Sequence, residues 1–67
     1  MTGAPAGELF RRAAARCTAS AADNAQAALD RLNSGAPEGA IELLRAATVA
    51  ARNAHTLITY AEEAEKK

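Results

Sequence analysis

The chain of 67 residues contains few of the residues that small proteins use to reinforce a core. It has one Phe, one Tyr, no Trp and a single cysteine. One cysteine excludes an intrachain disulfide, and the shortage of aromatic residues leaves mainly Leu, Ile and Ala to form a core. A core of this kind contributes only about 3–5 kcal/mol in a domain of this size. We therefore expect self-association to supply further stability.

Net charge, long apolar runs and a targeting segment are also missing. Eight Lys and Arg residues balance eight Asp and Glu residues, which argues against a protein that coats nucleic acid or an anionic membrane. No run approaches the ~18 apolar residues that a membrane-spanning helix needs. The first residues have neither the basic nor the apolar region of a signal peptide. With the single free cysteine, these features predict a cytoplasmic protein without a membrane partner, and the Ala- and Arg-rich usage suggests a bacterial source.

One short segment, Asn-Ser-Gly-Ala-Pro at residues 33–37, interrupts an otherwise helix-favouring sequence rich in Ala, Leu, Arg and Glu. Gly35 suits the left-handed conformation that follows a helix end. Pro37 suits the first turn of the next helix, where it has no hydrogen bond to lose. These signals predict an antiparallel two-helix hairpin over residues 8–67. Its parts are a flexible N-terminal lead at 1–7, a helix at 8–33, a turn at 34–36 and a helix at 37–66.

The first of these helices shows one apolar face with a helical period. Its members are Phe10, Ala14, Cys17 or Thr18, Ala21, Ala25, Ala28 or Leu29, and Leu32. Ser20 followed by Asp23 has the spacing of a local helix start. A continuous helix is therefore the expectation, with a break within residues 18–24 as the alternative.

The second helix is apolar around more than half of its circumference. One stripe with alternating spacings of three and four consists of Ala40, Leu43, Ala47, Ala50, Ala54, Leu57 and Ala61. A second stripe beside it consists of Ile41, Leu44, Thr48, Ala51, His55 and Ile58. A single helix partner covers one such stripe, not two. We therefore predict that the second stripe is the interface of a homo-oligomer, most simply a dimeric four-helix bundle.

In size and layout the chain resembles the Rop-type helical hairpin, which dimerises into a four-helix bundle. The segment Leu32–Ala47 also resembles the inter-helix turn of a single tetratricopeptide-type repeat. The first resemblance implies an alternative function, a nucleic-acid-binding regulator. Its candidate contact residues are Phe10, Arg11, Arg12 and Arg16, because an aromatic residue among arginines is one way of binding RNA. The antiparallel register instead places Arg11 and Arg12 near Glu62 and Glu63, and such ion pairs would cancel the field that phosphate binding requires.

His55 allows three interpretations. As a single polar residue in an apolar stripe, it helps to set the register of an interface. The residues Asn53-Ala54-His55-Thr56-Leu57 also resemble the Ala-His-x-Leu core of histidine-phosphotransfer helices, which implies a phosphate-accepting His55, although Ile58 and Thr59 stand where that family has Lys and Gly. Finally, the register places Cys17 beside His55, and a symmetric dimer would supply a Cys₂His₂ zinc set.

We expect no paired carboxylates that flank a cleft, and the sequence has no readable Ser/His/Asp set and no Gly-rich phosphate loop. The main hypothesis is therefore a small non-enzymatic interaction or regulatory protein, or an accessory subunit, without a cofactor. It would act through a helical face and bind a second copy of itself and another protein. The Rop-like regulator and the His55-centred phosphotransfer or metal-binding bundle remain the alternatives.

Overall fold

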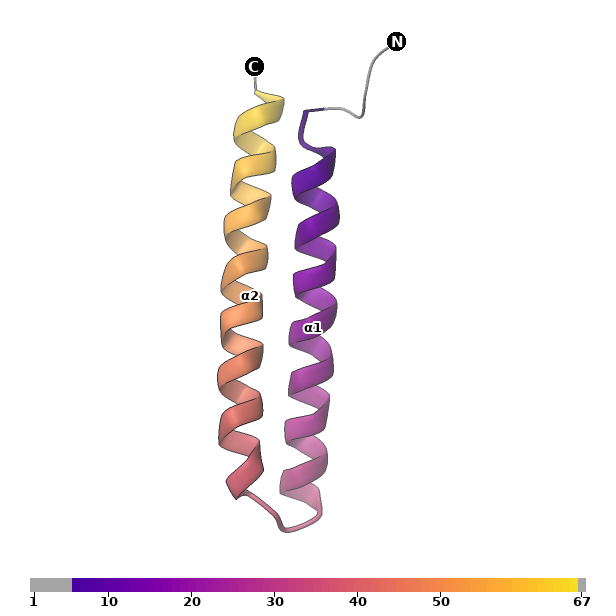
Figure 1. Cartoon of the computed structure of the whole chain (residues 1–67), viewed down its shortest axis with the longest axis vertical. Helices are drawn as coiled ribbons and strands as arrows, with labels where there is room; N and C mark the ends of the chain where they lie inside the picture. Colours follow the sequence, from indigo (N-terminus) through magenta and orange to yellow (C-terminus); the bar gives the residue numbers. More distant parts are fainter. Residues whose placement is uncertain (1–5, 67) are drawn as a thin grey trace.

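The computed structural model describes residues 6–66, which form two helices joined by a short turn (Figure 1). Helix α1 spans Glu8–Asn33 and helix α2 spans Glu38–Glu65. They lie side by side and antiparallel along their whole length, with the start of α1 and the end of α2 at the pole opposite the turn. The extents are 54 × 19 × 12 Å. The predicted two-helix hairpin is confirmed, and residues 1–5 of the predicted N-terminal lead lie outside the described residues.

Helix α1 passes without a break through residues 18–24, where the sequence offered a second helix start. The polar side chains there turn back onto their own helix. The Thr18 hydroxyl donates to the Ala14 carbonyl at 2.8 Å, and the Asn24 amide donates to the Ser20 carbonyl at 2.9 Å. Because these groups are satisfied within the helix, they do not compete with it for backbone partners.

The turn follows the helix-ending geometry known as a Schellman motif. Gly35 has a φ of 80°, in the left-handed region, as the sequence predicts. The Ala36 N–H donates to the Arg31 carbonyl at 2.9 Å, and the Gly35 N–H donates to the Leu32 carbonyl at 3.3 Å. Pro37 precedes α2, and its carbonyl accepts the Ala40 N–H at 3.0 Å. The backbone groups at the end of α1 and the start of α2 are therefore largely satisfied within the turn.

Small side chains fill the interface between the two helices. The buried side chains are Ala14 and Ala28 from α1 and Ala40, Ala54 and Ala61 from α2. On α2 the half-buried positions complete the first stripe that the sequence predicts, with Leu43 and Leu57 as its two large members. No large side chain in the described part of the chain is fully buried, so the hairpin lacks a core of the usual kind.

The inward face of α1 differs from the predicted one at three positions, the first of which is Phe10, which is 37% exposed. Asn24 is half-buried where Ala25 was expected, and Leu32 is exposed. The inward positions of α1 are alternately three and four residues apart. The position that follows Ala28 in this series is Arg31 and not Leu32. Arg31 lies across Gly39 in the first turn of α2.

Gly7, which the sequence analysis assigned to the N-terminal lead, caps α1 and is buried against the last turns of α2. A Cβ atom at this position would lie 2.9 Å from the Ala61 carbonyl oxygen and 2.6 Å from Glu65 Oε2. The backbones therefore approach closely at this pole, and glycine is the residue that fits.

Candidate interaction surface

Most of the large apolar side chains in residues 6–66 lie on the outside of the hairpin. The exposed ones are Leu9, Phe10, Leu29, Leu32, Ile41, Leu44, Val49, Ile58 and Tyr60. Isolated exposed apolar residues are normal, but a contiguous apolar surface marks an interaction site. These side chains therefore mark an interaction site only if they lie together on one side of the hairpin.

Every residue of the second stripe of α2 is exposed: Ile41, Leu44, Thr48, Ala51, His55 and Ile58. Helix α1 carries an equivalent exposed stripe, with the same alternation of three and four: Ala15, Thr18, Ala22, Ala25, Leu29 and Leu32. Sequence reasoning missed the stripe on α1. Its signal was present as a regular spacing, but four of its members are Ala or Thr, which contribute little to a hydrophobic pattern.

The two stripes lie on the same side of the hairpin. Near the open end, one groove is lined by Arg11 and Ala15 from α1 and by Ile58 and Glu62 from α2. Arg11 also forms an ion pair with Glu65 across the two helices. Ala15 and Ile58 belong to the two exposed stripes, so the stripes border one another along the groove. Together they form a continuous surface, which we call the apolar face.

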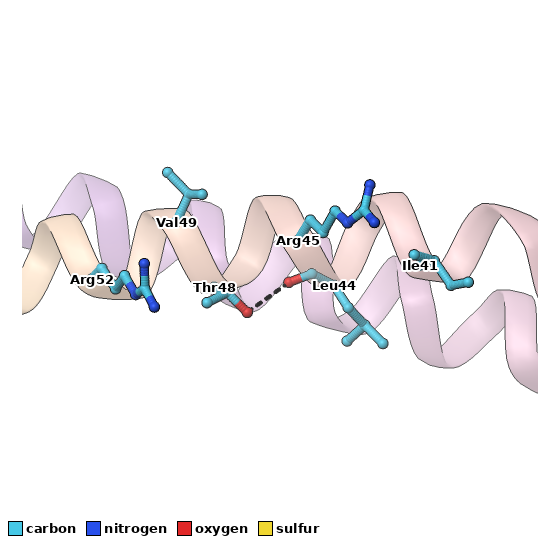
Figure 2. Close-up of a pocket in the computed structure, with 6 residues that line it drawn as sticks. All are labelled: Ile41, Leu44, Arg45, Thr48, Val49 and Arg52. Atoms are coloured by element: carbon cyan, nitrogen blue, oxygen red, sulfur yellow. Dashed lines mark hydrogen bonds between the residues drawn. The ribbon is translucent and has the colours of Figure 1, made fainter.

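Six side chains of α2 line one groove and leave the helix in different directions (Figure 2). Figure 2 shows Leu44 and Val49 leaving α2 in opposite directions. The Thr48 hydroxyl donates to the Leu44 carbonyl at 2.9 Å, so this polar group is already satisfied on the apolar face. Arg45, Val49 and Arg52 line this groove together with Ile41, Leu44 and Thr48, and the two arginines form the rim of the apolar face.

The basic cluster of the nucleic-acid alternative is engaged within the hairpin. Arg12 binds Glu8 one turn earlier in α1 at 2.6 Å, and Arg11 pairs with Glu65. Arg11 lines one groove with the expected Glu62 but forms its ion pair with Glu65, and Arg12 pairs within α1 and not with Glu63. The Phe10 ring packs against Tyr60, with 5.7 Å between the ring centroids.

His55 is exposed and lines a shallow groove with Thr48, Ala51 and Arg52 on α2. Cys17 is half-buried. Within residues 6–66, no group of three or more His, Cys, Asp or Glu side chains is arranged to hold a metal ion. A zinc set built from Cys17 and His55 would therefore need ligands from another chain.

Comparisons with protein-family models, curated proteins and solved structures find no match to this chain. Neither α1 nor α2 is long and apolar enough to cross a membrane.

Proposed function

We propose that this protein is a small non-enzymatic interaction protein whose apolar face binds a second copy of the chain to form a four-helix bundle. The exposure of the large side chains carries this proposal. The five on the apolar face are Leu29, Leu32, Ile41, Leu44 and Ile58, and they are between 45% and 57% exposed. The buried side chains between α1 and α2 are all alanines. Hydrophobic burial, the main favourable term in folding, is thus largely unused in one hairpin.

The size of the apolar face supports a second copy as its occupant. The 26 residues of α1 extend about 39 Å at 1.5 Å per residue. Over the 19 Å width of the hairpin, this length gives a face of roughly 740 Å². A stable protein–protein interface of standard size buries about 800 Å² on each partner. One face of the hairpin therefore matches what a stable dimer needs.

The pattern of the apolar face also supports this occupant. Each helix carries two neighbouring stripes, one used within the hairpin and one free. That arrangement is typical of a helix with two helix neighbours in a four-helix bundle. The free stripes contain little charge between Ala15 and Leu32 on α1 and between Ile41 and Ile58 on α2, so two copies can meet there without burying an unpaired ion.

The biological role that fits this surface is regulation or support of a larger assembly. A dimer of hairpins would still expose the outer sides of both helices, including Leu9, Val49 and Tyr60, to a further protein. The nucleic-acid alternative receives less support, because Arg11 and Arg12 are already paired with carboxylates.

Sedimentation velocity at micromolar concentration tests the proposal with two matched variants. Leu44→Asp places a charge on the apolar face, and Ala46→Asp places the same charge at an exposed position about 160° away around α2. We expect the unmodified chain and Ala46→Asp to sediment at twice the chain mass. Leu44→Asp should shift to the monomer and lose helicity in circular dichroism, because a buried unpaired carboxylate costs several kcal/mol.

A monomeric and cooperatively folded wild-type chain would contradict the proposal. So would an equal loss of association in the two variants, since it would place the interface away from the apolar face.

A further inference from the structure

The apolar face changes in character along its length. At the turn end it carries four large side chains: Leu29, Leu32, Ile41 and Leu44. The middle carries small or polar residues, among them Ala22, Ala51 and His55. At the open end Ile58 stands beside the charged groups Arg11, Glu62 and Glu65. The two ends of the face therefore differ in what they can bind.

Two copies can meet through this face in two symmetric ways. A two-fold axis along the bundle brings the turn ends together, and α1 of one copy then packs against α2 of the other. A two-fold axis across the bundle places the turn ends at opposite poles, and each helix then packs against its own counterpart. In the first arrangement each level of the face meets the same level of the partner.

With the turn ends together, the apolar turn end of each copy meets that of the other, and the charged open ends also meet. The large side chains of the two copies would meet in one apolar cluster, with Leu29 and Leu32 facing Ile41 and Leu44 of the partner subunit. At the other end Arg11 would face Glu62 and Glu65 of the partner subunit. Opposite charges on facing helices specify orientation as well as partner.

With the turn ends at opposite poles, the apolar end of each copy would instead meet the charged end of the other. This arrangement would lay Leu32 and Ile41 over the Arg11–Glu65 ion pair of the partner subunit and remove water from those charges. It would also bring Arg52, on the rim of the apolar face near the middle of α2, close to the level of Arg52 of the partner subunit. Like charges that face one another favour a different partner or orientation.

We propose that the two hairpins associate with their turn ends together, so that the Leu29, Leu32, Ile41 and Leu44 clusters merge and the start of α1 and the end of α2 of both copies lie at one pole of the bundle. This inference rests on the proposed function. It implies a dimer with two unlike poles: an apolar one at the turns and a charged one where Arg11, Glu62 and Glu65 of both copies lie.

Distances between spin labels distinguish the two orientations. Cys17→Ala removes the native thiol, and Ser34→Cys then places one label at the turn of each copy. With turn ends together, helices about 8–10 Å apart bring the two labels to within roughly 30 Å. With turn ends opposed, the labels would be separated by about the 54 Å length of the hairpin.

A mixed sample provides the matched control. Copies labelled at Ser34→Cys are combined with copies labelled at Lys66→Cys, which lies at the open end. The proposed orientation gives a long mixed distance and a short Ser34–Ser34 distance, whereas the opposed orientation gives the reverse.

Sedimentation of the same labelled samples separates the two proposals. A dimer with a short mixed distance would overturn the orientation and leave the proposed function standing. A monomer without any dipolar coupling would overturn both.

Discussion

Gly35 shows how one residue can be required by backbone conformation alone. Its φ of 80° lies in the left-handed region, and no heavy atom lies within 4 Å of the place where a Cβ atom would be. A side chain at this position would thus meet no neighbour. The destabilisation would come only from the backbone conformation, which residues other than Gly and Asn rarely adopt.

Replacing Gly35 by Val should therefore destabilise the hairpin by about 1–2 kcal/mol. In a domain of this size, each kcal/mol lowers the thermal midpoint by about 4–8 °C. The matched variant Gly35→Asn should lose much less, because Asn tolerates the left-handed region. Thermal unfolding followed by circular dichroism measures both, and equal midpoints for Val and Gly would contradict the argument.

At the scale of the helices, alanine determines how α1 and α2 approach one another. The five buried side chains are all alanines, and a Cβ atom at Gly7 would lie 2.9 Å from the Ala61 carbonyl oxygen. Contacts as short as these leave no room for larger residues at Gly7 and at the five buried alanines. Apart from the half-buried Leu43 and Leu57, the larger side chains therefore lie on the outside of the hairpin.

Enlarging a buried alanine should therefore destabilise the hairpin, although the new residue is more hydrophobic. For Ala28→Leu, at a position that is 1% exposed, we expect a loss of about 1–3 kcal/mol from overpacking. The control Ala19→Leu, on the exposed side of the same helix, should change stability by less than about 0.5 kcal/mol. Denaturant unfolding measures both, and a more stable Ala28→Leu variant would show that the helices can separate at low cost.

At the scale of the whole molecule, His55 is the polar residue in the middle of the apolar face. It is exposed in the single hairpin, and a second copy would remove it from water. A structural role for His55 in the register of the dimer and a chemical role as a phosphate acceptor or metal ligand lead to different outcomes when it is replaced.

If the apolar face is a dimer interface, His55→Leu should tighten self-association by about tenfold or more. A tenfold change is 1.4 kcal/mol, and full burial of one Leu side chain contributes about 1.5–3 kcal/mol. The control Asn53→Leu changes an exposed residue about 160° away around α2 and should leave the dimer affinity unchanged. Sedimentation equilibrium measures the affinities.

Unchanged association of the His55→Leu variant, together with loss of zinc uptake or phosphorylation, would instead favour the chemical role.

The hairpin could be predicted from sequence because its signals are local. Gly35, Pro37 and the helix-favouring residues around them act within a few positions of the chain, and they locate the turn without any tertiary contact. The second stripe of α2 could also be recognised, because Ile41, Leu44 and Ile58 are strongly apolar at regular spacing. Gly7 could not be assigned a role, since its requirement arises from Ala61 and Glu65, more than fifty residues away.

The sequence by itself determined the two helices, their turn and the presence of a free apolar stripe on α2. Only the tertiary structure decided which neighbouring positions of α1 turn inward, and therefore that Asn24 and not Ala25 faces α2. It also decided that the free stripe of α1 lies beside that of α2. The physical reason is that alanine differs little from its neighbours in hydrophobicity, so the rotation of an alanine-rich helix is set by how closely it packs against its partner.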